Sequence, residues 1–159
     1  MRTALVIVVP EVEPLIGRLR ERYDAAGAMG APSHVTLVFP FGDDEAGLEE
    51  LFAAVRPFDF ELVGTASFPD STLYLEPEPA GPFVRLVETL AARYPDHPPY
   101  GGTHETIVPH VTVGQNVPDE EERRIGAALP IRCRAEAVTW LEEGRNGRWA
   151  ERRRFTLGG

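Results

Sequence analysis

A duplicated tetrapeptide limits how this chain can fold. The sequence His-Val-Thr-Leu at residues 34–37 returns as His-Val-Thr-Val at residues 110–113, 76 positions later. Because side chains alternate between the two faces of a β-strand, the His and Thr of each copy share one face and the aliphatic residues share the other. Each copy is therefore expected to be a strand with one polar face and one apolar face that packs into a core.

The residues around the two copies alternate between strand-like and helix-like hydrophobic patterns. Period-two runs predict strands at residues 3–9, 34–39, 58–68, 72–76, 106–114, 131–142 and 149–157. Period-3.6 patterns predict helices at residues 12–23, 43–55, 83–94 and 118–129, with loops at 27–32 and 95–103. Since strand–helix–strand units recur around each motif, we expect a bilobal α+β fold, with two antiparallel sheets around a central cleft, helices outside, and a pseudo-twofold duplication.

Length and composition predict one folded domain over residues 1–159. Hydrophobic residues make up 43% of the chain, which fits a globular protein. The apolar run at residues 4–9 is too short for a membrane helix and lacks a small-residue cleavage site, so no signal peptide is expected. The single cysteine, Cys133, excludes an internal disulfide and fits the cytoplasm. We expect its thiol to be buried and inert. We also expect the protein to be a monomer.

The net charge of −9 is unevenly distributed. Residues 1–122 hold 21 acidic residues and 7 arginines, whereas residues 123–159 hold 4 acidic residues and 9 arginines. Extended nucleic-acid binding is not expected of an acidic protein, because it depends on neutralising phosphates. A single nucleotide or RNA end beside the basic C-terminal third is compatible with this charge, although solvated strand arginines explain it equally well. In a regular strand, Arg152 and Arg154 would share one face and could line a phosphate entry route.

The two motif histidines, His34 and His110, form the candidate catalytic pair. One histidine on a strand is usually structural, but here two of the four histidines share the same local sequence. The unperturbed pKa of histidine is about 6.5, so one ring can act as a base and the other as an acid near neutral pH. Thr36 and Thr112 are the candidate phosphate-binding hydroxyls, which would donate to the non-bridging oxygens. This set suits phosphoester cleavage, and no Asp/Glu cluster accompanies it, so we expect no metal and no cofactor.

These residues resemble the two-histidine phosphoesterase superfamily, which includes the 2′-5′ RNA ligase-like proteins and RNA 2′,3′-cyclic phosphodiesterases. The resemblance covers most of the chain. It rests on Ser33–Leu37, on Phe68 with the following strand Leu73–Leu75, on Val108–Val113, and on the Pro/Gly-rich stretch Tyr94–Gly102. The double motif is specific, whereas the connecting segments are weak signals.

The resemblance implies a bilobal fold with both motifs in the cleft and a reaction that opens 2′,3′-cyclic phosphates to 2′-phosphomonoesters. It implies His110 as the base that activates water and His34 as the acid, an assignment that depends on which way the substrate lies. Some relatives join RNA ends in reverse or act on small cyclic phosphates. This chain has no arginine beside the second motif, where Glu105–Ile107 and Gln115-Asn116 stand instead. A small cyclic nucleotide, or another small phosphodiester, is therefore favoured over polymeric RNA.

Three aromatic residues are candidates for stacking on a substrate. Phe39 lies in phase with the aliphatic motif residues, which favours the core, while Phe41 is balanced between core and substrate. Tyr100, in the Pro/Gly-rich loop, is a candidate lid residue. Phe68 and Tyr74 have the same two interpretations, packing and stacking.

Two alternatives to an enzyme stay open. The first is a non-catalytic protein that binds a nucleotide or RNA end in the same cleft, and the second is an α+β domain whose His-x-Thr strands only pack. A metal site built from His97, His104 and His110 is disfavoured, because their spacing is irregular and no cysteine or clear carboxylate partner accompanies them.

Overall fold

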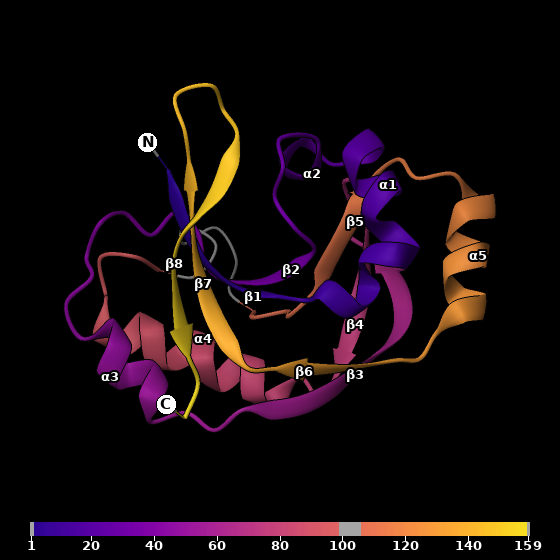
Figure 1. The fold of residues 1–159 in the computed structure, drawn as a ribbon. Coiled ribbons are helices and arrows are strands. Elements are labelled where there is room, and N and C mark those ends of the chain that lie inside the picture. Colours follow the sequence, from indigo (N-terminus) through magenta and orange to yellow (C-terminus); the bar gives the residue numbers. More distant parts are fainter. Residues whose placement is uncertain (1, 99–105, 159) are drawn as a thin grey trace.

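The computed structural model describes residues 2–98 and 106–158, and Figure 1 shows how their strands and helices are arranged. The strands are β1 (Thr3–Val8), β2 (His34–Val38), β3 (Phe58–Ser67), β4 (Thr72–Glu78), β5 (Val111–Gln115), β6 (Ile131–Ala135), β7 (Ala137–Glu143) and β8 (Trp149–Thr156). The helices are η1 (Pro10–Val12), α1 (Glu13–Tyr23), α2 (Ala25–Ala28), α3 (Leu48–Ala53), α4 (Gly81–Arg93) and α5 (Asp119–Ala128). None of the described helices is long and apolar enough to cross a membrane.

The strands form one antiparallel sheet in the order β6-β3-β4-β5-β2-β1-β7-β8. This order contains two matching halves. One half is the unit β1–α1–β2 with β7 and β8 beside it, and the other is the unit β4–α4–β5 with β3 and β6 beside it. The halves join at β2 and β5, where Val35 is paired with Val111. The predicted α+β fold with two related antiparallel halves is confirmed, and the two predicted sheets are continuous through this pair.

One face of the sheet is covered by helices and forms the hydrophobic core. Helix α1 packs on β5 and α4 packs on β2, so the helix of each half contacts the motif strand of the other half. The core joins the four aliphatic motif residues to helix residues that include Ile16, Phe52, Phe83 and Leu90. The predicted alternation is therefore confirmed, because the aliphatic residues of both motifs are buried and the His and Thr residues are only half-buried.

Two predicted strands differ from the structure. The strand predicted at 131–142 is interrupted at Glu136, where the chain passes from β6 at one edge of the sheet to β7 in the other half. The strand predicted at 106–114 begins only at Val111, so that His110 lies directly before β5.

Two helical segments also differ. The helix predicted at 43–55 is limited to the six residues of α3. The loop predicted at 27–32 begins within the short helix α2, whose Gly27 amide donates to Asp24 Oδ2 at 3.1 Å. A side chain that caps a single turn creates a helix too short to be detected from hydrophobic periodicity.

Gly114 in β5 gives a test of the packing between α1 and the second motif strand. A Cβ at Gly114 would lie 2.5 Å from Cβ of Tyr23, the last residue of α1. Gly114→Ala should therefore lower the free energy of unfolding by about 1–3 kcal/mol, measured by urea denaturation. Gly126→Ala is the matched control, because nothing lies within 4 Å of its added Cβ. The control should raise stability by up to about 1 kcal/mol, and a Gly114→Ala protein as stable as the wild type would contradict this packing.

Candidate active site

The four polar side chains of the two motifs lie on one face of the sheet. The middle valines of the motifs are paired across the antiparallel β2–β5 ladder, and both are buried. Continuing that register by one residue in each direction puts His34 opposite Thr112 and Thr36 opposite His110. Directly opposed residues share a face and have Cβ atoms about 5 Å apart. Each histidine therefore faces the threonine of the other motif.

Both histidine rings are anchored by the same type of backbone contact. Nδ1 of His34 lies 2.7 Å from the carbonyl oxygen of Pro32, and Nδ1 of His110 lies 2.7 Å from that of Val108. A carbonyl oxygen can only accept a hydrogen bond, so Nδ1 of each ring carries the hydrogen and donates it. This contact fixes the tautomer, so that in each neutral ring Nε2 carries the lone pair that can take up a proton.

The environment of His34 favours its neutral form. Burial of the imidazole lowers the pKa of His34 from 6.5 to about 4, and it outweighs the hydrogen bond to Pro32, which raises that pKa. Among the neighbouring charges, Arg20 and His110 lower the pKa further, and Asp24 raises it. At neutral pH the ring is therefore uncharged and able to accept a proton.

Two aromatic side chains pack against the ring of His110. Phe68 and Tyr74 stack with ring centroids 4.3 Å apart, and their centroids lie 5.0 Å and 5.5 Å from that of His110. Tyr74 is paired with Thr112 across β4 and β5, which puts it on the same face as the motif side chains. The aromatic pair therefore supports His110 from the side of the cleft away from β2.

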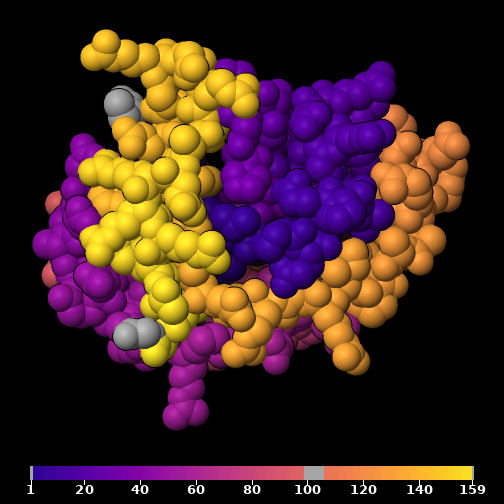
Figure 2. All heavy atoms as spheres, viewed as in Figure 1, coloured from indigo at the N-terminus to yellow at the C-terminus, as the bar shows by residue number. Residues whose placement is uncertain are grey.

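A pocket of about 400 Å³ opens beside His34 and Thr36. Its walls come from the β7–β8 hairpin and from residues 24–31, which include α2, and both rise at the top of the molecule in Figure 2. Phe39 and Trp149 line it and pack edge to face, with ring centroids 5.9 Å apart. This pocket lies on the His34 side of the motif pair, and neither His110 nor Thr112 lines it.

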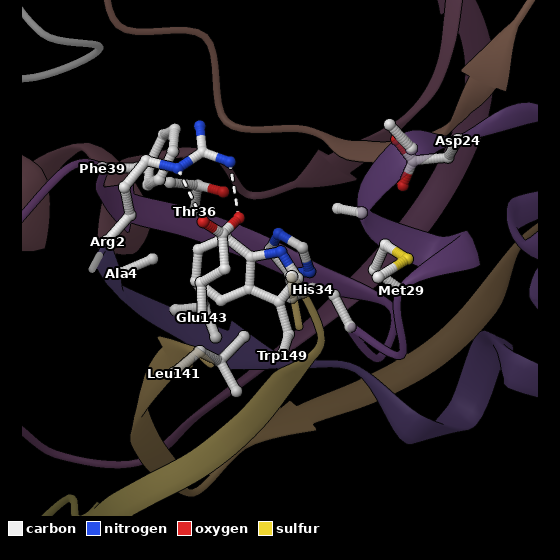
Figure 3. A pocket seen from close by; sticks show the side chains of 15 residues that line it. Arg2, Ala4, Asp24, Met29, His34, Thr36, Phe39, Leu141, Glu143 and Trp149 are labelled. Carbon is white, nitrogen blue, oxygen red and sulfur yellow. Dashed lines mark hydrogen bonds and ion pairs between the residues drawn. The ribbon is translucent and has the colours of Figure 1, made fainter. Parts of the chain in front are cut away.

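Charged groups lie at the ends of this pocket. In Figure 3 an ion pair between Arg2 and Glu143 lies at one end, and Asp24 and Met29 lie at the other. Arg2 donates to the carboxylate of Glu143 through Nε at 3.2 Å and Nη2 at 2.5 Å. A mostly apolar pocket with a few polar groups is suited to a planar ring that has polar edges.

The three stacking candidates have different outcomes. Phe39 is half-buried and lines the pocket. The prediction for Phe41 is wrong, because this side chain is fully buried and packs against Tyr94 and Trp140, so no face is available to a substrate. Tyr100 lies outside the described residues, and its role stays a prediction.

An extra residue in β2 explains why Phe39 reaches the pocket although it was expected in phase with the core. The pairing between β1 and β2 shifts by one position at Leu37. Leu37 and Val38 are consecutive buried residues, so the alternation resumes out of phase after them. Phe39 therefore turns to the face that carries Thr36.

Arg20, a buried arginine of α1, contacts the site but was not expected from the motifs. Its guanidinium donates to the carbonyl oxygens of Thr112 at 3.2 Å and Ala31 at 2.6 Å, and it forms an ion pair with Asp24 at 3.0 Å. Only 3% of the Arg20 side chain is exposed. A signal existed in the sequence, because Arg20 follows Ile16 by four positions and so falls on the buried stripe of the helix.

The remaining titratable candidates lie away from the motifs or outside the described residues. Within residues 2–98 and 106–158, no group of three or more His, Cys, Asp or Glu side chains could hold a metal ion. His97 packs against Phe41 with centroids 4.9 Å apart, and His104 falls in the undescribed segment. Cys133 is buried, and burial raises the pKa of its thiol to about 12, as expected for an inert cysteine.

Solved structures share this fold over the whole chain. TT0787 of Thermus thermophilus superimposes with a TM-score of 0.64 at 21% identity, covering 100% of this chain and 99% of that one. Escherichia coli LigT complexed with 3′-AMP gives a TM-score of 0.58 at 17% identity, covering 99% and 98%. These similarities define the class of protein by its two-lobed architecture.

Sequence comparison identifies the family. The 2′-5′ RNA ligase superfamily matches residues 8–147, so the chain belongs to this superfamily, as the two His-x-Thr motifs suggested. A Geobacillus kaustophilus protein named "Putative phosphoesterase" is 27% identical, covering 100% of this chain and 98% of its own. A Bacillus pumilus protein of the same name is 29% identical and covers 96% of both chains.

The ionisation of His34 can be measured directly. Its imidazole should titrate with a midpoint near pH 4 in histidine NMR spectra, because burial lowers its pKa to about 4. The unfolded chain binds more protons at this position between pH 6.5 and 4, so His34 should make stability fall as the pH drops through this range. The acid-induced loss of unfolding free energy should therefore be smaller in His34→Asn than in the wild type. A midpoint near 6.5 would contradict the burial of this ring.

Proposed function

We propose that the protein is a phosphoesterase that opens the 2′,3′-cyclic phosphate of a small nucleotide to a 2′-phosphomonoester without a metal ion. His34 and His110 are the proton carriers, and Thr36 and Thr112 bind the phosphate. The observation that carries the proposal is the antiparallel opposition of the two motifs, with both Nδ1 atoms bonded to a backbone carbonyl.

The reaction needs one base and one acid on opposite sides of the phosphorus. The base removes a proton from water as the water oxygen forms a bond to phosphorus. The bond between phosphorus and the ribose 3′-oxygen breaks, and the acid donates its proton to that oxygen. The product is a 2′-phosphomonoester, and the proton gained by the base returns to the acid through solvent. Thr36 and Thr112 donate to the non-bridging oxygens as their charge grows.

The pocket suggests which histidine has which role. Because it opens beside His34, we expect the nucleoside there and the departing ribose oxygen next to that ring. His34 is then the acid and His110 the base, as the family resemblance implied. His34 must gain its proton in the complex, and the negative charge of a bound phosphodiester favours this by raising the pKa of the ring.

The substrate expected from the pocket is a mononucleotide. A volume of about 400 Å³ holds one nucleoside with aromatic rings at its wall. LigT of Escherichia coli has been solved with 3′-AMP and with ATP, which supports a nucleotide ligand here. The net charge of −9 disfavours an extended RNA. In a screen of 2′,3′-cyclic mononucleotides, cyclic-phosphate RNA ends and ADP-ribose cyclic phosphate, we expect the mononucleotides to have the highest kcat/KM.

One observation favours the alternative of a non-catalytic nucleotide-binding protein. His34 is neutral in the ligand-free protein, and a ring with no proton on Nε2 cannot act as a general acid unless the ligand raises its pKa. Binding of cyclic and linear nucleotides with no turnover over the whole screen would support this alternative. Ligation, the reverse of ring opening on an RNA end, would use the same groups.

Removal of either histidine tests the catalytic pair. His34→Ala and His110→Ala should each lower kcat for nucleoside 2′,3′-cyclic phosphates by about 10²- to 10⁴-fold, the contribution of one general acid or base. Phosphorus NMR separates 2′- from 3′-phosphate products, and EDTA should not change the rate. The control is His97→Ala, which removes a histidine outside the pocket and should keep full activity. A folded, fully active His34→Ala or His110→Ala protein would rule out the proposal.

Trp149 tests where the nucleobase of the substrate binds. Trp149→Ala should raise KM for nucleoside 2′,3′-cyclic phosphates roughly 10-fold, because stacking on an aromatic ring contributes about 1–3 kcal/mol per base. Trp149→Phe, which keeps an aromatic face, should have a smaller effect. Glycerol 1,2-cyclic phosphate has no base, so its hydrolysis should be unaffected by either substitution. An equal loss of activity toward both substrates would show that the nucleobase does not bind at Trp149.

A further inference from the structure

We propose that Arg20 is a positioning residue that ties the two His-x-Thr segments together and, with Asp24, sets the charge that His34 faces. Arg20 lies in α1, which is part of neither motif strand. It does not line the pocket, so its action on a substrate would be indirect. The kinetic part of this inference rests on the proposed phosphodiesterase function, but the electrostatic part does not.

The contacts of Arg20 join the backbone of the second motif to the segment just before the first motif. Nη1 donates to the carbonyl oxygen of Ala31, three residues before His34, and Nε donates to the carbonyl oxygen of Thr112 within the second motif. The planar guanidinium fixes the relative directions of these two bonds. One side chain therefore holds a carbonyl from each half of the protein at a fixed spacing.

Asp24 completes the arrangement. Its Oδ2 pairs with Nη2 of Arg20 at 3.0 Å and accepts the Gly27 amide at 3.1 Å, so one carboxylate binds both the guanidinium and the first turn of α2. A buried guanidinium needs such a partner, because an unpaired charge is costly away from water. The charge of Arg20 acts on His34 in one direction, and that of Asp24 acts in the other.

Other charged groups also face His34. His110 approaches it from the chain just before β5, and the ion pair between Arg2, directly before β1, and Glu143, at the end of β7, lies across the pocket. Arg2 and Glu143 balance each other, and neither contacts the Arg20 network. The effect of Arg20 and Asp24 can therefore be tested by changing these two residues alone.

The first test is a titration of His34 in the absence of substrate, monitored by histidine NMR. The midpoint should rise in Arg20→Gln, which removes the positive charge, and fall in Asp24→Asn, which removes the negative charge. Asn at position 24 can still cap α2, so the local fold is kept. A purely structural role would not give shifts of opposite sign. Arg22→Gln is the matched control, because Arg22 is an exposed arginine of the same helix, and it should leave the midpoint unchanged.

The second test separates positioning from charge. Arg20→Lys keeps the charge but cannot donate to both carbonyls and Asp24 in the same geometry. The midpoint for His34 should stay near that of the wild type, whereas kcat for a nucleoside 2′,3′-cyclic phosphate should fall about 10- to 100-fold with KM little changed. If Arg20→Gln does not fold, the Arg20→Lys and Asp24→Asn proteins still decide the question.

The two failures can be told apart. Two results together would overturn the role of Arg20: an unchanged His34 midpoint in Arg20→Gln and Asp24→Asn, and a kcat for Arg20→Lys within twofold of the wild type. If Arg20→Gln does not fold, the midpoint in Asp24→Asn alone decides the first result. If the wild type hydrolyses no cyclic phosphate, the proposed function fails. The titration then decides by itself whether Arg20 and Asp24 set the charge at His34.

Discussion

The pairing of β2 with β5 is the interaction on which the rest of the site depends. It brings together two segments 76 residues apart, and its antiparallel direction makes each histidine face the threonine of the other motif. A shift of one residue would turn one motif toward the wrong face of the sheet. The buried aliphatic residues on the opposite face prevent this, because Val35 and Val111 would then be exposed. Core packing and the geometry of the site are thus set by the same register.

The alternation in the two motifs was enough to predict the four residues that share a face, and the recurring strand–helix–strand pattern around them predicted the fold class, because both patterns are local properties of the sequence. Irregular strands could not be predicted in this way. An extra residue at Leu37 moves Phe39 to the pocket, while Phe41 ends in the core. A second irregularity, between β7 and β8, breaks the expected common face of Arg152 and Arg154, since Arg152 packs over a core tryptophan. Such bulges depend on the neighbouring strand.

The crossing of α1 from one half to the other explains why the motifs alone did not reveal Arg20. The absence of arginine beside the second motif suggested a site with few cations, yet α1 brings Arg20 to the backbone of the second motif and of the segment just before the first. Its position on the buried stripe of the helix could be read from the sequence, but its carbonyl partners come from distant segments. The pocket is also a product of tertiary structure, because its walls come from the β7–β8 hairpin that carries Trp149 and from the distant segment around α2.

A double-mutant cycle on the two histidines tests most directly whether the motifs form one acid–base unit. The measurement is kcat for a nucleoside 2′,3′-cyclic phosphate in the wild type, His34→Ala, His110→Ala and the double variant, all in EDTA. If the two rings act in one concerted step, the double variant should be about as slow as the slower single variant, because residues that act as a unit are strongly non-additive. Losses that simply multiply, or a single variant with wild-type kcat, would contradict the account.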